Sequence, residues 1–354
     1  MSDTTGPPEP AGPEDSLNPG AAAAERMEPV NRRKRRGLRI ALVSLASFVL
    51  LVGAVAGGGF LYLNHLVNSV QRIPVQFTKL DSANARRYGS EYGGAMTVLI
   101  TAEDLGPTGD RRITGPTPSG LIMLLHVNAE GYNGSVVSIP PRVMVSVPGH
   151  GRMELEDTLD IGGPTLMVKT IQDLTHVQIN HYAHIDLSKV DQAVNAMGGV
   201  DVDLPDRTDG FGHIFHVGID DLTGRTALDY AREDNLTEEQ RVLREQALIR
   251  AVVRKLVHRH LLSNPVTDFR VLHAFISMLT LDSNFTVAEL KKVGKEIGDL
   301  TGSADYVTAP KHETHGRQYL DRKIARQLWA AIRQDAVAAF AKKYPFTVTP
   351  AAPR

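Results

Sequence analysis

Three arginines lie close together in the sequence, around the expected start of a long helix: Arg232, Arg241 and Arg244. Thr237 and Gln240 have the Thr-x-x-Gln spacing of a capping box, which predicts that the helix begins at about Glu238. Backbone N–H groups at a helix N-terminus favour negative charge, and arginine binds phosphate oxygens through two parallel hydrogen bonds. The segment is therefore a candidate phosphate-binding site.

The same arginines have a second interpretation. Arg241 and Arg244 share a helix face, and the helix macrodipole disfavours cations in the first turns. They therefore require either an anionic ligand or acidic neighbours, and Glu238 and Glu239 could neutralise them on a solvated surface. Both interpretations stay open at this point. The buried face of this helix is expected at a 0, 3, 4, 7 spacing, which selects Ile249, Val252, Val253 and Leu256.

The N-terminal part of the chain predicts a membrane anchor. Residues 1–31 are rich in Pro, Ala, Gly and acidic residues, which predicts a disordered tail. A basic cluster at residues 32–39 precedes an uncharged, mostly apolar run at residues 40–64, long enough to span a bilayer at ~20 residues. The positive-inside rule then predicts a single-pass protein of the cell membrane, with a cytoplasmic N-terminus and an extracytoplasmic main domain. A cleaved signal peptide ending at Ala54-Val55-Ala56 is the alternative, and the length of the apolar run argues against it.

Composition limits the remaining possibilities. The chain has 354 residues and no cysteine, so thiol catalysis and thiolate metal sites are excluded. Its formal net charge of −1 gives no general case for nucleic acid as a partner. We expect a linker at residues 65–89, one external domain at residues 90–342 and a C-terminal tail at residues 343–354.

Strand and helix patterns alternate through the external domain, which predicts an α/β fold with a mixed central sheet flanked by helices, preceded by one transmembrane helix. The expected strands are Thr97–Thr101, Leu121–Val127, a further pair formed by Val136–Ile139 and Val143–Val147, and the half-exposed Val200–Leu204. The expected helices follow Gly162-Gly163-Pro164, carry the stripe Leu187, Val190, Val194 and Met197, and lie near Val287–Leu300 and Asp321–Ala341.

Taken in order, these segments resemble the LytR-CpsA-Psr family of cell-envelope proteins over about residues 90–340. The matching motifs are Ser138-Ile139-Pro140, Pro148-Gly149-His150-Gly151, Gly162-Gly163-Pro164, Met197-Gly198-Gly199-Val200-Asp201-Val202 and Ala227-Leu228-Asp229-Tyr230-Ala231-Arg232. The resemblance implies an extracytoplasmic α/β domain that binds polyprenyl-(pyro)phosphate-linked glycans and transfers the glycan to peptidoglycan or a related wall acceptor. Because that domain would face away from the chromosome, we expect no nucleic-acid partner.

The resemblance also implies roles for individual residues. Arg232, Arg241 and Arg244 match the family's phosphate-binding arginines, and Arg142 is a displaced cation after Ser138-Ile139-Pro140. Diphosphate transfer usually uses Mg²⁺ held by carboxylates and a general base. Only Glu103 and Asp104 stand near the place of the family's catalytic and metal-binding acids.

Other positions depart from the family pattern. Gly120, Pro141, Glu154 and Glu245 stand where the family has charged residues or glutamine. Two hypotheses follow, a glycopolymer transferase and a non-catalytic binding or regulatory protein, and the lost acids favour the second. Three histidine pairs at i, i+3 spacing are expected to be surface residues rather than metal sites, because two ligands do not make a zinc site and no pair has a companion acid at a recognised spacing: His181 and His184, His213 and His216, and His312 and His315.

Overall fold

The computed structural model describes residues 65, 68–78, 95–103, 120–128, 134–204, 208–210, 213–232, 237–258, 269–286, 288–290, 293 and 305–349. The chain divides into two compact units, Met1–Gly57 and Gly58–Arg354, and all described residues belong to the second. The expected anchor at residues 40–64 lies outside these residues. No helix within the described ranges has both the length and the apolar composition needed to cross a bilayer.

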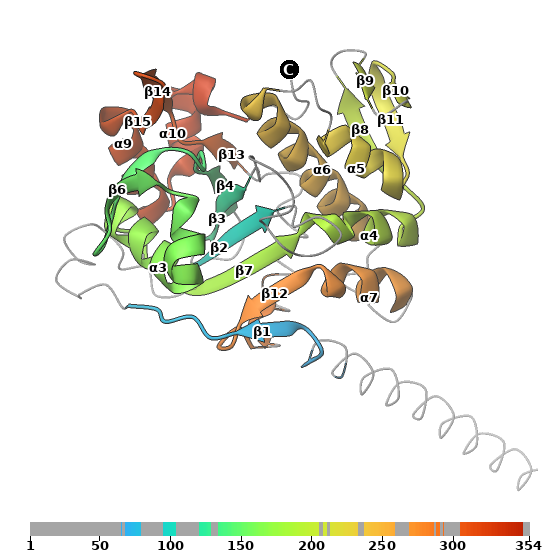
Figure 1. Cartoon of the computed structure of the whole chain (residues 1–354), viewed down its shortest axis with the longest axis horizontal. Helices are drawn as coiled ribbons and strands as arrows, with labels where there is room; N and C mark the ends of the chain where they lie inside the picture. Colours follow the sequence, from blue (N-terminus) through green and yellow to red (C-terminus); the bar gives the residue numbers. More distant parts are fainter. Residues whose placement is uncertain are drawn as a thin grey trace, which may run out of the picture. The chain divides into compact units, whose positions relative to one another are not determined.

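A seven-stranded mixed sheet forms the centre of the domain, in the order β1-β12-β7-β2-β3-β4-β13 (Figure 1). Its strands are β1 Gln71–Ile73, β2 Met96–Glu103, β3 Leu121–Val127, β4 Gly134–Ser138, β7 His181–Asp186, β12 Leu279–Asp282 and β13 Asp305–Thr308. The pairs β1–β12, β2–β7 and β4–β13 are parallel, and β7–β12, β2–β3 and β3–β4 are antiparallel. The prediction of a mixed central sheet is confirmed.

Four two-stranded antiparallel ribbons accompany this sheet in the described ranges. They pair β5 Met144–Val147 with β6 Gly151–Glu154, β8 Val200–Leu204 with β11 Gly218–Leu222, β9 Thr208–Gly210 with β10 His213–Phe215, and β14 Lys311–Thr314 with β15 Arg317–Leu320. The expected pairing of Val136–Ile139 with Val143–Val147 is wrong, because β4 pairs with β3 and β13 while β5 pairs with β6. The Pro140-Pro141 dipeptide does not form a hairpin turn but separates two sheets.

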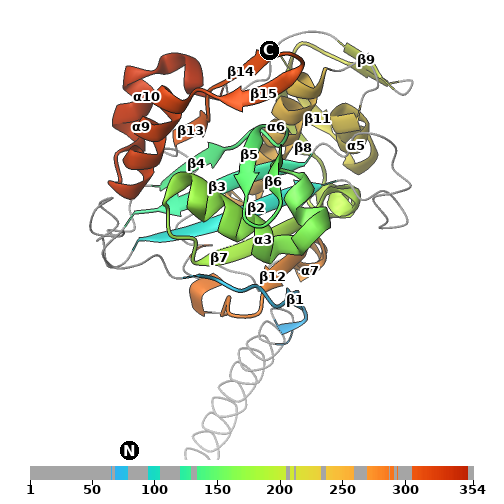
Figure 2. The same cartoon turned by 60° about the vertical axis from the view of Figure 1, so that its left-hand side comes forward.

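Helices cover both faces of the sheet. Their bounds are α3 Asp157–Thr175, α4 Val190–Ala196, α5 Gly224–Arg232, α6 Glu238–His258, α7 Phe269–Ser277, α9 Arg322–Arg333 and α10 Val337–Lys343, with 3₁₀ turns η1 Leu187–Lys189 and η2 Pro345–Thr347. Figure 2 shows α3 lying across one face, with α9 and α10 beside it. The opposite face packs against α4, α5, α6 and α7, whose apolar residues share a second core cluster.

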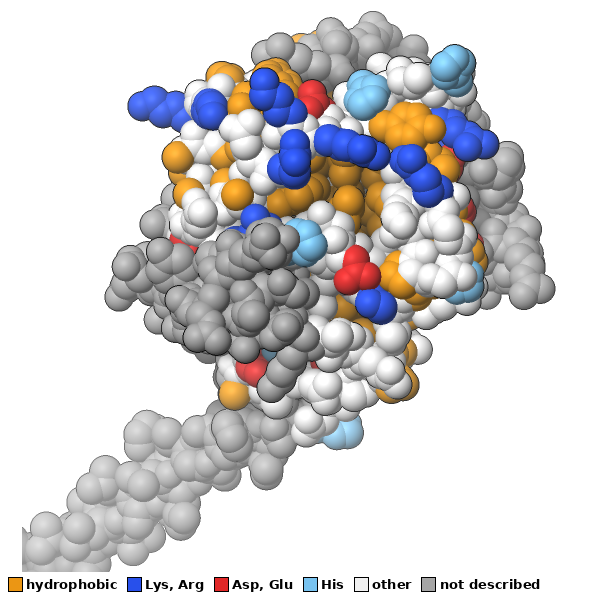
Figure 3. All heavy atoms as spheres, turned by 90° about the vertical axis from the view of Figure 1, so that its left-hand side faces the viewer, with side chains coloured by type: hydrophobic (Ala, Val, Ile, Leu, Met, Phe, Trp, Pro, Cys, Tyr) orange, Lys and Arg blue, Asp and Glu red, His pale blue; other side chains and the backbone are white. Residues whose placement is uncertain are grey.

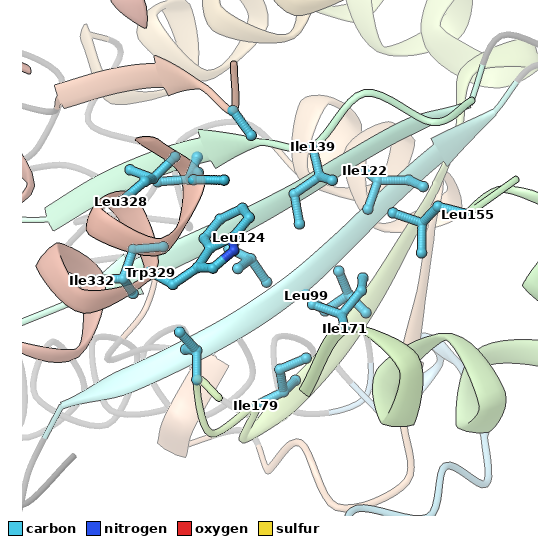
Figure 4. Close-up of a cluster of buried hydrophobic side chains, with 14 of the residues drawn as sticks. Leu99, Ile122, Leu124, Ile139, Leu155, Ile171, Ile179, Leu328, Trp329 and Ile332 are labelled. Carbon is cyan, nitrogen blue, oxygen red and sulfur yellow. The ribbon is translucent and has the colours of Figure 1, made fainter. Parts of the chain in front are cut away.

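The alternation of side chains in β3 explains this double covering. All seven residues of β3 are buried, as a continuous apolar run predicts for a strand with helices on both sides. Ile122 and Leu124 point to the α3 side, whereas Leu121 and Met123 belong to the cluster on the α6 side. Figure 4 shows the α3-side core, which gathers Leu99, Ile122, Leu124, Ile139, Leu155, Ile171, Ile179, Leu328, Trp329 and Ile332.

Helix α3 is interrupted by the Gly163-Pro164 pair. Gly163 has φ 62° and ψ −165°, a backbone conformation that residues with a Cβ rarely adopt, and it separates a short first segment from the main helix. Pro164 then stands at the start of the main segment, where its missing N–H is no loss. The prediction that these residues open a helix is confirmed, and the main segment buries Met167 and Ile171 fully and Leu174 partly.

The C-terminal helices differ from the prediction of one helix at Asp321–Ala341. The chain instead forms α9 and α10, separated by a turn in which Asp335 has φ 52°. Asp321 caps α9 by accepting hydrogen bonds from the backbone N–H groups of Lys323 and Ile324. The break lets both helices bury apolar faces, because Trp329 and Ile332 of α9 and Phe340 of α10 enter the same cluster.

The domain also extends beyond the expected boundaries of residues 90 and 342. In place of a linker, Val70 and Val75 are buried and β1 joins the sheet. In place of a C-terminal tail, Thr347 and Thr349 are buried and Thr349 donates its N–H to the carbonyl of Tyr306. These segments lie at the two outer strands of the central sheet, β1 and β13, so they belong to the folded unit.

Candidate functional site

The C-terminal ends of three inner strands, β2, β4 and β7, lie on the same side of the central sheet. β2 and β7 are parallel and finish together, since Glu103 pairs in register with Asp186. β4 ends at Ser138, which pairs with Met123 near the start of the antiparallel β3. The segments that carry the family-like residues therefore converge, and we call this edge, formed by Glu103, Asp186, Gly120 and Ser138, the strand-end site.

The predicted catalytic acids have different positions in this arrangement. Glu103 is the last residue of β2 and so lies at the strand-end site by backbone position, although its side chain is not among the described ones. Asp104 lies outside the described residues. Their roles as catalytic groups and metal ligands stay predictions.

Arg142 lies just after the end of β4 and contacts a carboxylate. Its Nε donates to Oε2 of Glu154 at 3.2 Å, with the two side chains 42% and 30% exposed. Backbone bonds hold the two segments together, because the Glu156 N–H donates to the Pro141 carbonyl at 2.9 Å. Glu154, which the family resemblance places where lysine is expected, is therefore the ion-pair partner of Arg142.

More carboxylates lie beside this pair. A Cβ added at Gly120 would stand 4.0 Å from Oε2 of Glu156, in ordinary van der Waals contact, so an acid lies next to the start of β3. The pKa of Asp157 is raised above its ordinary value of 3.8, mainly by partial burial and secondly by repulsion from Glu154. The electrostatic environment between Arg142 and α3 is thus more acidic than basic.

The α5–α6 corner, formed by the end of α5 and the start of α6, brings the predicted arginines together. Helix α5 packs closely on α4 because it begins with Gly224, where an added Cβ would stand 2.1 Å from the Asp191 carbonyl oxygen. Gly224 also donates its N–H to Oδ1 of Asn195 at 3.0 Å. Arg232 ends α5 and Arg241 lies in the first turns of α6, both with side chains outside the described set.

The capping-box prediction for α6 is confirmed. The Thr237 N–H donates to Oε1 of Gln240 at 3.0 Å, and the Gln240 N–H donates to Oγ1 of Thr237 at 3.3 Å. The buried face of α6 is rotated from the expected stripe, because Leu248 and Ala251 are more buried than Ile249 and Val253. Packing against β8 and β3 as well as α5 accounts for the wider buried face.

Arg244 has a structural partner in this corner. Its guanidinium donates to the Tyr230 carbonyl oxygen at 3.1 Å and lies 4.8 Å from the centre of the Tyr230 ring. A cation near the C-terminal carbonyls of α5 is favoured by the helix dipole, and stacking on the fully buried Tyr230 adds a cation–π contact. Arg244 therefore fixes α5 to α6, a role that neither sequence-based interpretation had included.

Gln246 is a site residue that sequence reasoning missed. Its side-chain Nε2 donates to Oγ of Ser138 at 2.9 Å, with both residues buried, so α6 is tied directly to the strand-end site. Glu245, which occupies the position of a family glutamine, is also buried at 4% exposure. A Glu-Gln pair on a helix that otherwise buries apolar residues was the signal that could have identified Gln246.

The described residues do not fit a Mg²⁺ site by themselves. They contain no group of three or more His, Asp or Glu side chains arranged to hold a metal ion. Near the strand-end site Glu154 contacts Arg142, and Asp186 lies 3.1 Å from Nζ of Lys189. The prediction of Mg²⁺ rests on Glu103 and Asp104 alone.

The histidine pair in β7 illustrates why i, i+3 spacing gives no metal site there. Neighbouring strand residues alternate between faces, so His181 and His184 point to opposite sides of the sheet. His181 lies 3.2 Å from Oδ2 of Asp282, whereas Nδ1 of His184 is 3.0 Å from Oγ1 of Thr101. The expectation of a surface histidine is wrong for His181, which is 6% exposed and also lies 3.5 Å from Oε1 of Glu289.

One face of the domain carries many cations. Figure 3 shows several Lys and Arg side chains in the upper half of this face, with apolar surface between them. The strands β6 and β15 and the helix α9 carry exposed basic residues, namely Arg152 in β6, Arg317 in β15, and Arg322, Lys323 and Arg326 in α9. Arg152 also lies 5.5 Å from the Tyr319 ring centre.

Known proteins share this fold. The LytR-CpsA-Psr enzyme of Actinomyces oris superposes with a TM-score of 0.56 at 19% identity, over 74% of this chain and 95% of that one. Bacillus subtilis TagV superposes with a TM-score of 0.55 at 17% identity, over 69% of this chain and 97% of that one. These likenesses establish the arrangement of strands and helices.

Sequence relatives have names from cell-wall biosynthesis. The polyisoprenyl-teichoic acid–peptidoglycan teichoic acid transferase TagU of Enterococcus faecalis is 29% identical over 173 residues, 48% of this chain and 56% of that protein. The probable cell wall biosynthesis protein LcpB of Corynebacterium glutamicum is 28% identical over 237 residues, 65% of this chain and 56% of that protein. The matches thus span little more than half the length of these relatives.

The family model agrees with the motifs and the fold. The model of the LytR_cpsA_psr family matches residues 67–330, from just before β1 into α9. That range includes the strand-end site and the α5–α6 corner. The chain therefore belongs to the LytR-CpsA-Psr family.

Proposed function

We propose that this protein is a single-pass membrane protein of the cell envelope that binds a polyprenyl-(pyro)phosphate-linked glycopolymer at its strand-end site. Arg232, Arg241 and Arg244 would contact the phosphates, with Arg142 on the other side of the site. The family role, transfer of the glycan to peptidoglycan or a related wall acceptor, agrees with the names of the relatives. The observation that carries the proposal is the convergence of β2, β4 and β7 at one edge, tied to α6 through the Gln246–Ser138 hydrogen bond.

Binding without transfer is the second candidate, and two observations favour it. Arg142 is engaged by Glu154, so part of its charge is already compensated. Gly120 offers no side chain where the family has charged residues, and the neighbouring acid is Glu156. A site that keeps cations for phosphate but has lost acids that the family resemblance implies is better suited to holding the lipid phosphate than to promoting its displacement.

A turnover assay separates the two candidates. The full chain in detergent would be incubated with Mg²⁺ and a polyprenyl diphosphate, and both bound ligand and released phosphate would be measured. Release that disappears in Glu103→Ala or Asp104→Ala would support a transferase, whereas binding without release would support a binding protein. If the Arg241→Ala, Arg244→Ala double variant kept both ligand binding and phosphate release, the result would contradict both candidate functions.

A further inference from the structure

A pocket of about 400 Å³ opens beside the strand-end site, between α3 and the strands β1, β12 and β7. This volume lies in the range of about 300–1,000 Å³ that is usual for small-molecule sites. Its lining includes Gln71, Asp160, His184, Asp186, Lys189 and Thr280. Asp186 pairs in register with Glu103, so the pocket and the end of β2 are neighbours.

Polar contacts hold the floor of this pocket in place. Oγ1 of Thr101 lies 2.7 Å from the Tyr182 hydroxyl and 3.0 Å from Nδ1 of His184. Because Thr101 and Tyr182 are almost fully buried, this network fixes the imidazole without exposing the hydroxyls. The His184 ring is thus preorganised at the pocket wall.

The pocket rim is fixed in the same way. Asp186 caps the 3₁₀ turn η1, with its Oδ1 accepting from the Ser188 N–H at 3.0 Å. Its Oδ2 lies 3.1 Å from Nζ of Lys189, which also donates to the Ser277 carbonyl oxygen at 3.2 Å. The carboxylate and the ammonium therefore keep a fixed spacing before any ligand arrives.

The charge of this lining selects against phosphate. Asp160 and Asp186 contribute two carboxylates against the single ammonium of Lys189, so a diphosphate would meet net like charge. A sugar hydroxyl, in contrast, both donates and accepts hydrogen bonds. Carboxylates supply acceptors, Lys189 supplies donors, and Gln71 and Thr280 supply both, which matches a neutral polyol.

We propose that this pocket binds a neutral pyranose unit of a cell-wall glycan, on the acceptor side of the strand-end site. The proposal rests on the proposed function, because it adds a sugar subsite to the lipid-phosphate site. In this proposal the two ligands bind at places of different charge. The cationic α5–α6 corner binds the phosphates, and the polar pocket at β7 binds the hydroxyl-bearing acceptor. It requires no transfer step, since a binding protein could hold both glycans.

The test uses chitotetraose, a neutral N-acetylglucosamine oligosaccharide, with the full chain in detergent. Saturation-transfer NMR and calorimetry would measure its binding to the wild type and to Asp186→Asn and Lys189→Met. Asp186→Asn keeps an acceptor for the Ser188 N–H, so η1 stays capped, and Thr280→Trp would fill the pocket without removing a charge. The control is Lys169→Met, since Lys169 lies on α3 and is paired with Asp173 away from the pocket.

We expect chitotetraose binding that each pocket variant weakens at least about tenfold and that Lys169→Met leaves unchanged. Farnesyl diphosphate should bind Lys189→Met and Thr280→Trp, whose positions lie outside the strand-end site, as it binds the wild type and should not displace the sugar. Absence of sugar binding to the wild type, equal binding by the pocket variants, or displacement by farnesyl diphosphate would overturn the proposal. Failure of farnesyl diphosphate to bind would instead contradict the proposed function, so the two failures are distinguishable.

Discussion

Gln246 on α6 donates a hydrogen bond to the Ser138 hydroxyl at the end of β4, at 2.9 Å, and both side chains are buried. This contact joins the helix that carries Arg241 and Arg244 to the sheet edge that carries Glu103 and Asp186. Helix α6 and the strand ends are thereby held in one geometry. The relative position of these two parts determines whether one ligand can reach both.

The Gln246–Ser138 contact should contribute measurably to stability. Gln246→Leu leaves the Ser138 hydroxyl buried without this donor, at an expected cost of about 1–3 kcal/mol in the free energy of unfolding. Ser138→Ala in the same background should restore part of the loss, because both polar groups are then removed. Urea denaturation of the two single variants and the double variant would measure this coupling, and strictly additive effects would argue against the bond.

Arg244 should be irreplaceable by lysine. Arg244→Lys keeps the charge but loses the planar guanidinium that stacks on Tyr230 and bonds to its carbonyl oxygen. We expect a loss of about 1–2 kcal/mol in the free energy of unfolding, from the cation–π contact and the hydrogen bond together. Arg326→Lys on the exposed face of α9 is the matched control and should be neutral; a neutral Arg244→Lys would show that the corner does not depend on this stacking.

Glu154 should restrain phosphate binding by Arg142. Glu154→Lys removes the carboxylate that accepts from the Arg142 Nε and adds a second cation at the position where the family has one. Because the pair is solvent-accessible, we expect less than about 1 kcal/mol of change in stability. The affinity for farnesyl diphosphate, measured by calorimetry at low salt, should rise; unchanged or weaker binding would place Arg142 outside the ligand's reach.

Glu289 gives a prediction about pH. Burial by itself would raise its pKa, but hydrogen bonds from Thr286 and the charge of His181 outweigh burial and lower the pKa below 4.5. A lowered pKa in the folded state stabilises the protein above the unfolded value, and this stabilisation is lost as pH falls through the folded value. Glu289→Gln should therefore lower the melting temperature at pH 7, and the difference from wild type should shrink below pH 4.5. An equal difference at pH 7 and at low pH would rule out this charge effect.

Structural features that depend only on residues close together in the sequence could be predicted. The fully buried β3 and the capping box of Thr237 and Gln240 could be predicted, because each depends on neighbouring residues only. The strands β1, β12 and β13 could not, because each is short and pairs with residues far away in the chain. Asp335, whose left-handed turn splits the expected C-terminal helix, likewise has a distant partner, because its Oδ1 lies 2.7 Å from Nε2 of His126.

At the candidate site, too, contacts between distant parts of the chain could not be predicted from the sequence. Arginine and acid positions followed from motifs, so Arg142, Arg232, Arg241, Arg244 and Glu103 could be named. Their partners could not, because the Arg142–Glu154, Arg244–Tyr230 and Gln246–Ser138 contacts join separate elements. Whether an arginine is available for a ligand or serves the fold is decided by such contacts.

The dissociation constant of the full chain for a polyprenyl diphosphate is the most direct test of the proposed phosphate site at the α5–α6 corner. The Arg232→Met, Arg241→Met double variant, which leaves the Arg244–Tyr230 contact in place, would be compared with Arg322→Met, Arg326→Met, which removes the same charge from the exposed face of α9. We predict that the first weakens binding at least about tenfold while the second leaves it within about twofold of wild type, because the α5–α6 corner is proposed to contact the phosphates and the exposed face of α9 is not. Equal dissociation constants for the two double variants would contradict the account.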